Sequence, residues 1–132
     1  MFKNLFQLYT LISCFVASLI ILIASIFFLG AITNFLIPQY TFYSQHAHFE
    51  SNESYLLFKK TQYVVEDKEI QEINKLSPSS LFEKRSQEKA QFFVNKKGNA
   101  IETLIHSLEW IIVSALFFCI HWRLYKKSLR GF

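Results

Sequence analysis

The feature that most constrains this chain is a run of 33 residues, Leu5 to Ile37, that holds no acidic or basic side chain. As a helix such a run is about 50 Å long, whereas the hydrocarbon core of a bilayer is about 30 Å thick. We therefore predict a membrane-spanning helix over residues 5–37, after a short cytoplasmic N-terminus of residues 1–4. Pro38 should end this helix, because the residue before a proline avoids helical geometry.

A cleaved signal peptide is the alternative interpretation of this run. The apolar core of a signal peptide has about 7–15 residues, and a small-residue cleavage site follows it. The run here is much longer, and no clear site of that kind closes it. The length favours an uncleaved signal anchor.

A second span is predicted near the C-terminus, and it is shorter. Only 13 residues, Trp110 to Trp122, are free of acids and of formal cations, which is about 20 Å of helix. Gly98 is a natural break, and Asn99-Ala100-Ile101-Glu102 has the form of a capping box. We predict a helix that begins at Ala100, spans the membrane over residues 100–123 and continues into a basic cytoplasmic tail, 124–132. A re-entrant or surface-lying helix is the alternative.

The distribution of charge argues for a membrane protein and against a nucleic-acid partner. All ten acids lie between Glu50 and Glu109, where bases are interleaved with them, so the net charge of +4 comes mainly from the tail. Basic residues favour the cytoplasmic side. This predicts that both termini lie in the cytoplasm and residues 38–99 outside. The abundance of Phe, Ile, Lys and Asn is typical of a bacterial chain, so the expected location is the bacterial inner (cytoplasmic) membrane. The expected interface anchors are Trp110, Trp122, Arg123, Lys126 and Lys127.

The loop of residues 38–99 shows two kinds of pattern. Residues 39–50 and 55–66 are rich in Tyr, Phe, Thr and Val around a polar turn, 51–54, which favours a β-hairpin; continuation of the first helix is the alternative. Residues 66–76 and the stretch after Ser77-Pro78 favour amphipathic helices, the second with a weak stripe of Leu81, Phe82, Phe93 and Val94. The expected fold is an all-α, two-span membrane hairpin with this mixed loop.

Small residues recur along both predicted spans every seven positions. In lipid, small residues let helix backbones approach closely, and a seven-residue period favours a left-handed crossing. We predict that the two spans pack along these residues, with chance recurrence of common residue types as the alternative. The seam consists of Ala17, Ala24 and Ala31 on the first helix and of Ser107 and Ser114, in register with Ala100, on the second.

Three ionisable residues lie on one face of the second helix, roughly opposite its small residues. Glu102, His106 and Glu109 are spaced by four and three residues, which places them on one side of a helix. Ionisable groups at membrane depth are costly and usually face a partner, a cavity or a pathway. The alternative is that all three simply lie among lipid headgroups.

A metal site is a weaker hypothesis. His46 and His48 would point to one side of a strand, and His106 and Glu102 fall on the same side of the membrane. No spacing motif joins the four, and surface histidines are the ordinary explanation. The sequence holds no phosphate loop, nucleophile elbow, zinc-protease helix or dinucleotide fingerprint, so we expect neither an enzyme nor a cofactor.

The helix ending Phe117–Leu124 contains His121-Trp122-Arg123. This stretch resembles helix endings in an uncharacterised family of bacterial membrane domains that carry a His-Trp-Arg signature. The likeness implies a bacterial membrane setting and transfers no activity.

Three functions follow from these patterns. The first is a structural or interaction subunit that presents its loop and acidic face to a protein partner or to copies of itself. The second is a small oligomeric, ion-conducting or membrane-permeabilising protein that uses Glu109 and His106. The third is an accessory subunit that handles metal ions or protons.

Overall fold

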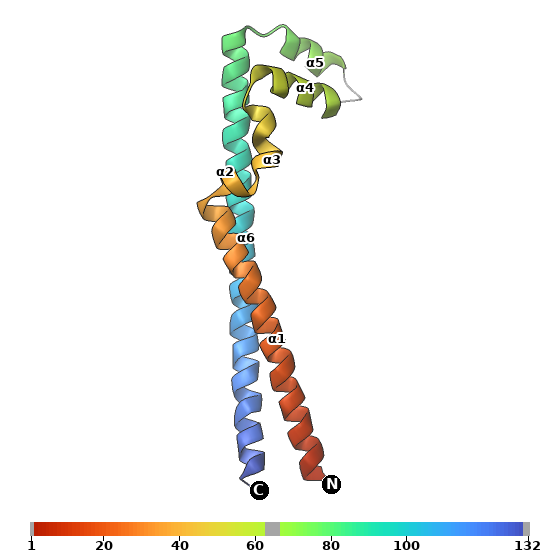
Figure 1. Cartoon of the computed structure of the whole chain (residues 1–132), viewed down its shortest axis with the longest axis vertical. Helices are drawn as coiled ribbons and strands as arrows, with labels where there is room; N and C mark the ends of the chain where they lie inside the picture. The colour runs from red at the N-terminus through yellow and green to blue at the C-terminus, as the bar shows by residue number, and fades with distance from the viewer. Residues whose placement is uncertain (1, 63–66, 131–132) are drawn as a thin grey trace. The chain divides into compact units, whose positions relative to one another are not determined.

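The computed structural model describes residues 2–62 and 67–130 and is helical in nearly all of them (Figure 1). No strand occurs in that described part of the chain. The elements are α1 (Phe2–Leu36), α2 (Pro38–Thr41), α3 (Tyr43–His46), the 3₁₀ helix η1 (Ala47–Phe49), α4 (Asn52–Gln62), α5 (Asp67–Asn74) and α6 (Pro78–Leu129).

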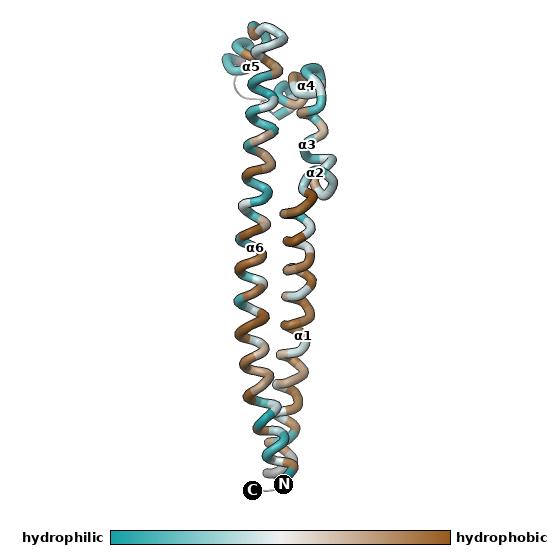
Figure 2. The backbone as a smooth tube through the Cα atoms, turned by 90° about the vertical axis from the view of Figure 1, so that its left-hand side faces the viewer, coloured by the Kyte–Doolittle hydropathy of each residue, from teal (hydrophilic) through white to brown (hydrophobic). Residues whose placement is uncertain are grey.

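Two of the helices are long and apolar enough to cross a membrane. The candidate spans are Leu5–Leu36, and a segment within the 52-residue helix α6. The hydropathy colouring in Figure 2 shows apolar residues along most of α1 and along the part of α6 beside it. As predicted, α1 stops before Pro38: the last α-type hydrogen bond runs from Ile37 N to Thr33 O (3.0 Å), and Ile37 itself leaves helical geometry.

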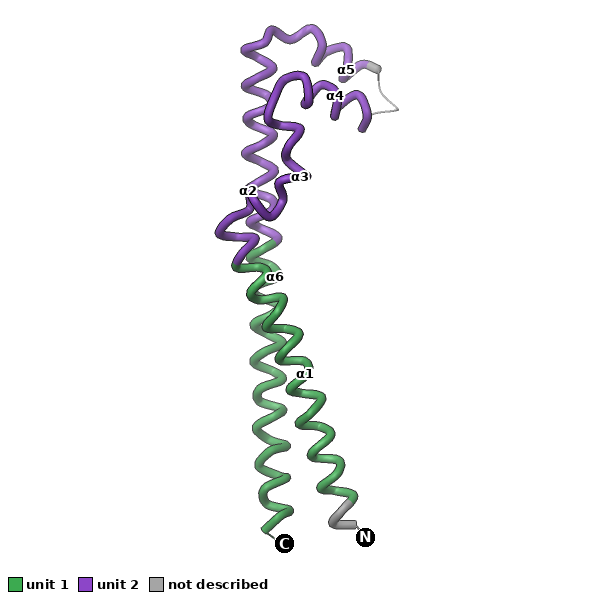
Figure 3. Tube along the Cα trace, viewed as in Figure 1, with its two compact units in different colours: residues 1–32, 100–132 green, residues 33–99 purple. Residues whose placement is uncertain are grey.

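The chain divides into two compact units, coloured in Figure 3. Unit 1 consists of Met1–Ile32 and Ala100–Phe132, and it is an antiparallel pair formed by most of α1 and the C-terminal part of α6. Unit 2 is Thr33–Asn99 and holds the short helices together with the N-terminal part of α6.

Unit 2 has a small hydrophobic core of its own. Phe49, Tyr55, Ile73 and Leu81 are buried, and Phe92 packs against them. These residues come from η1, α4, α5 and α6, so each of these four elements contributes at least one apolar side chain to the core. Two ion pairs join its helices across long stretches of sequence: Lys59 to Glu88 at 3.3 Å and Lys89 to Glu50 at 3.1 Å.

The expected β-hairpin was wrong for the described residues, which form α2, α3, η1 and α4. The polar turn at 51–54 is a helix start: the Ser51 hydroxyl accepts the Ser54 amide (3.1 Å), and the Ser54 hydroxyl accepts the Ser51 amide (3.3 Å). This reciprocal pattern satisfies free amides of α4 as a capping box does. Aromatic and β-branched content is a weak guide to strands because strand preference depends on context. Residues 63–66 of the expected second strand lie outside the described residues.

The expected helix start at Ala100 was also wrong. Helix α6 begins at Pro78, where the Ser77 carbonyl accepts the Leu81 amide (2.9 Å), and it runs through Gly98 and Asn99. A single glycine inside a helix costs only about 1 kcal/mol relative to alanine, so it need not end one. The Ser77-Pro78 start was one of the predicted helix signals. The residues of the expected apolar stripe differ in burial. Leu81 is buried, whereas Phe82 and Val94 are more than half exposed.

Candidate functional site

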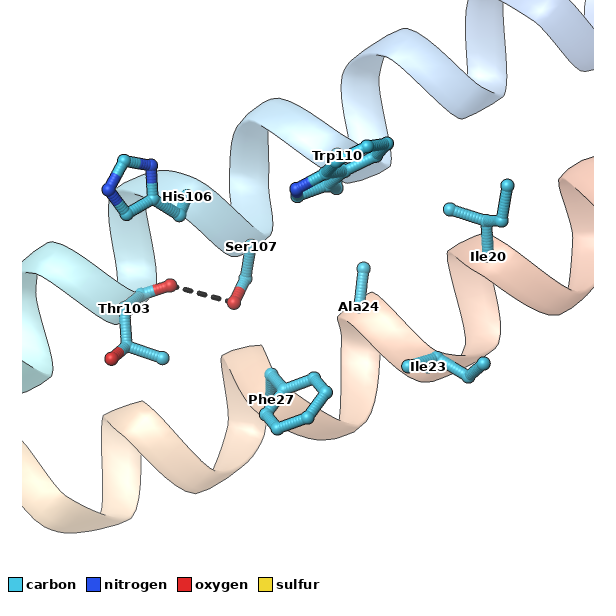
Figure 4. Close-up of a pocket in the computed structure, with 8 residues that line it drawn as sticks. All are labelled: Ile20, Ile23, Ala24, Phe27, Thr103, His106, Ser107 and Trp110. Atoms are coloured by element: carbon cyan, nitrogen blue, oxygen red, sulfur yellow. Dashed lines mark hydrogen bonds between the residues drawn. The ribbon is translucent and has the colours of Figure 1, made fainter.

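Unit 1 is held together by a seam with a seven-residue period. All five seam residues predicted from the sequence are buried, and so is Ala100. The same period continues toward the chain ends, where Thr10, His121 and Ser128 are buried as well. Figure 4 shows Ala24 pointing toward the helix turn that carries Ser107. The buried residues of the seam are Thr10, Ala17, Ala24 and Ala31 on α1, and Ala100, Ser107, Ser114, His121 and Ser128 on α6.

The hydroxyls of Thr10, Ser107 and Ser128 in the seam are hydrogen-bonded within their own helices. Ser107 Oγ donates to the Thr103 carbonyl (2.7 Å), as drawn in Figure 4, and Thr10 Oγ1 lies 2.9 Å from the Gln7 carbonyl. A buried hydroxyl without a partner is costly, so these local bonds let small polar residues stand where the helices approach. The small size of the seam residues therefore allows the close approach of the helices, and these three hydroxyls bond to carbonyls of their own helix.

One side of the seam is hollowed into a groove. A hollow of about 530 Å³ is lined by Ile20, Ala24, Phe27, Ser107 and Trp110, among others, with His106 at its edge (Figure 4). A second hollow of about 240 Å³ follows, and it shares Ile20 and Trp110 with the first. We call the two together the hairpin groove. Trp110 is 60% exposed and lies over this groove.

The three ionisable residues form a connected triplet beside the groove. His106 Nδ1 lies 3.1 Å from a Glu109 carboxylate oxygen, and His106 Nε2 lies 3.9 Å from a Glu102 oxygen. The side chains of all three residues are more than 60% exposed. In Figure 4 the His106 ring points away from α1. The acidic triplet, as we call these residues, is thus available to a molecule outside the hairpin.

The helix register fixes the level of the triplet relative to α1. Ala24 and Ser107 line one hollow, Ala17 and Ser114 line the next, and the Tyr9 and His121 rings are 5.9 Å apart. Because the helices are antiparallel, these pairs place Glu109 at the level of about Leu22. That level is well inside the uncharged run of α1.

The basic end of unit 1 is rich in aromatic contacts. Trp122 stacks on Phe118 (centroids 5.9 Å apart), and the Lys126 ammonium lies 5.6 Å from the Trp122 ring. The Gln7 side chain donates to the Ser128 carbonyl (3.2 Å), which joins the two helices. Arg123 and Lys127 lie on the last turns of the same helix. These groups suit a membrane boundary, where tryptophan and lysine side chains concentrate.

The histidines of unit 2 lie in a different setting from the one expected. His46 is buried, its Nε2 is 2.8 Å from the Gln39 carbonyl, and its ring packs at 5.0 Å from Phe93. His48 stacks on Phe58 with centroids 3.7 Å apart. Since this segment is helical, His46 and His48 do not share a strand face. Among the described residues, no group of three or more His, Cys, Asp or Glu side chains is placed to hold a metal ion.

Two titrating groups of unit 2 are shifted by their surroundings. Burial among the aromatic rings lowers the pKa of His48 below its usual value, although Glu88 nearby acts in the other direction. The Lys89 ammonium, which donates to Glu50 at 3.1 Å, holds the pKa of the Glu50 carboxyl below its usual range.

Some contributors were not identified in the sequence. Thr10, His121 and Ser128 extend the seam, and the seven-residue period alone would have found them. Phe92 and the Lys59–Glu88 pair belong to unit 2, and only the folded arrangement of α4 on α6 brings that pair together.

Comparison with known proteins identified no relative of this chain. No protein-family model, no curated protein and no solved structure matches it significantly.

Proposed function

We propose that this chain is an integral protein of a bacterial inner membrane that serves as a structural or interaction subunit. In this proposal α1 and the apolar part of α6 cross the bilayer, both termini are cytoplasmic, and unit 2 lies outside. The bacterial setting rests on the composition and on the resemblance at residues 121–123.

The case for a membrane comes from exposure as well as composition. Within the most apolar window of each long helix, only 17% of α1 and 11% of α6 is buried in the structure. A core helix of a soluble protein would be mostly covered. Large side chains such as Phe15 (63% exposed), Leu22 (61%) and Leu116 (62%) need an apolar surrounding that the chain itself does not provide.

The observation that carries the interaction role is the acidic triplet. It lies outside the seam on a helix that is otherwise apolar at that level. If the inner boundary is near Trp122 and Arg123, a 30 Å core reaches outward to about Glu102, which puts Glu109 about 10 Å inside. Charge at such a depth marks a functional contact more often than a passive one.

The test is site-specific photocrosslinking in native membranes. A photoreactive residue at Val113 lies in the hairpin groove, and one at Leu108 lies on the other side of α6 and serves as the matched control. We expect a discrete protein adduct from Val113 and none from Leu108. Adducts with lipid alone at both positions would contradict the interaction role, and an adduct of twice the chain mass would indicate self-association.

A second candidate is an ion-conducting oligomer. The 3.1 Å contact between His106 and Glu109 favours it, because such a pair can exchange a proton. Ion flux through proteoliposomes that falls in Glu109→Gln would support this function, and the absence of flux in the parent protein would exclude it.

A further inference from the structure

The hairpin groove runs along a large part of unit 1. Its two hollows share Ile20 and Trp110, and its lining extends along α6 from Thr103 to Phe117. The fourteen helical steps from Thr103 to Phe117 rise about 21 Å, which is roughly two thirds of the hydrocarbon core. The groove therefore has the length of a helix contact.

The floor of the groove suits a helix. It contains Ala17, Ala24, Ser107 and Ser114, the small residues of the seam. Side chains of a third helix can enter above such residues and pack against both helices at once. Lipid chains also fill grooves, so the floor alone does not identify the occupant.

The wall of the groove on α6 leads directly to the acidic triplet. Trp110 and Val113 line it, His106 lies at its edge, and Glu102 and Glu109 occupy the adjoining strip of the helix surface. A helix lying in the groove would thus contact apolar side chains on α1 and would lie beside the acidic triplet on α6.

The acidic groups of this surface indicate which kind of side chain a partner helix should carry. The triplet consists of two carboxyl groups and one imidazole and includes no lysine or arginine. No lysine or arginine occurs in residues 5–32 or 100–122. The hairpin therefore has no strong base of its own at this depth, and a carboxylate in an apolar medium is stabilised by an opposite charge.

A second copy of this chain is a poor fit for the same groove. Two copies inserted in the same direction bring Glu109 to the same depth in both. Like charges that close together repel, and neither copy adds a lysine or arginine to offset them.

We propose that the hairpin groove binds a transmembrane helix of a different protein, and that this helix carries one lysine or arginine that pairs with Glu109. This inference rests on the proposed interaction function and names the chemistry of the partner.

The test uses the full-length protein in lipid vesicles, with Cys14 and Cys119 replaced by serine and a fluorescent donor attached through Arg130→Cys. The probes are two acceptor-labelled transmembrane peptides of leucine and alanine, one with a single lysine about 10 Å from its end and one with leucine there. We expect the lysine peptide to bind roughly tenfold more tightly, since polar contacts between membrane helices reach about that size.

Variants separate the charge from the groove. Glu109→Gln should abolish the preference for the lysine peptide, whereas Glu72→Gln, an exposed change in unit 2, should preserve it. Val113→Trp should fill the groove and weaken both peptides, whereas Leu108→Trp should affect neither. Equal binding of the two peptides, or an unchanged preference in Glu109→Gln, would overturn the proposal. A Val113 protein adduct in native membranes would then still support the interaction function, so the two failures are distinguishable.

Discussion

At the scale of single residues, His48 is a histidine whose pKa is lowered by burial. Its ring is stacked on Phe58 and also lies 4.0 Å from Phe49. Because burial lowers its pKa, the unfolded chain binds a proton more readily than the folded chain. The stabilisation is complete above the unfolded pKa of about 6.5 and is lost as the pH falls below it.

We therefore predict that unit 2 loses stability between pH 7 and pH 5, and that His48→Phe removes most of this loss. Phenylalanine preserves the stacked ring and cannot be protonated. Thermal unfolding of the detergent-solubilised protein, followed by circular dichroism at both pH values, measures the effect. An NMR titration should give His48 a pKa below 6.5.

The Glu50–Lys89 pair provides an internal comparison. The pKa of Glu50 is also lowered, so its contribution is present above about pH 4.5 and is lost only in stronger acid. A loss of stability near pH 6 that persists in His48→Phe would assign the effect to another group and contradict the prediction.

Residue spacing predicted the acidic triplet but not the setting of the unit 2 histidines. Glu102, His106 and Glu109 lie on one helix, so their proximity follows from helical periodicity alone. His46 and His48 depend on Phe58 from α4 and on Phe93 from α6, which lie 10 to 47 positions away in the sequence. Contacts of that kind require the packing of unit 2, which no local pattern encodes.

At the scale of helices, the seam should tolerate no increase in side-chain volume. Ala17 is 1% exposed, whereas its neighbour Ser18 faces outward. We predict that Ala17→Leu destabilises the hairpin by about 1–3 kcal/mol, the usual cost of overpacking, and that Ser18→Leu has little effect.

Disulfide formation across the hairpin measures this difference. Cysteines introduced by Phe27→Cys and Thr103→Cys line the same hollow, in a chain whose native cysteines are replaced by serine. Oxidation should be about tenfold slower or more in the Ala17→Leu variant and unchanged in the Ser18→Leu variant. Equal rates in both would mean that the seam is not the packing surface.

The errors in helix prediction have a common cause. Capping signals are short, and not every one marks a helix start: Asn99-Glu102 lies inside α6, whereas Ser77-Pro78 begins it. The turn at 51–54 is another such signal that suits a helix start as well as a hairpin. The periodic spacing of residues over a whole helix was a better guide to the helices than short capping signals, because packing supplies most of the stability of a helix.

At the scale of the whole molecule, unit 1 brings the start of α1 and the end of α6 to the same end (Figures 1 and 3). Basic residues gather there, and the loop segment directly after α1, residues 38–49, carries no acid, lysine or arginine. In the proposed two-span topology, both chain ends face one side of the membrane and residues 33–99 face the other. The positive-inside bias favours the cytoplasm for the chain ends in this proposal.

We predict that a membrane-impermeant maleimide distinguishes two single-cysteine variants, Gln71→Cys and Arg130→Cys. Both positions are exposed, so labelling reports the side of the membrane and not burial; Ser128, at 7% exposure, would be a poor choice. In right-side-out vesicles Gln71→Cys should react and Arg130→Cys should not, with the reverse in inverted vesicles. Detergent should make both reactive, which controls for local shielding. If both cysteines react from the same side in intact vesicles, the apolar part of α6 does not cross, and the acidic triplet then lies at the membrane surface, where its carboxylates need no basic partner.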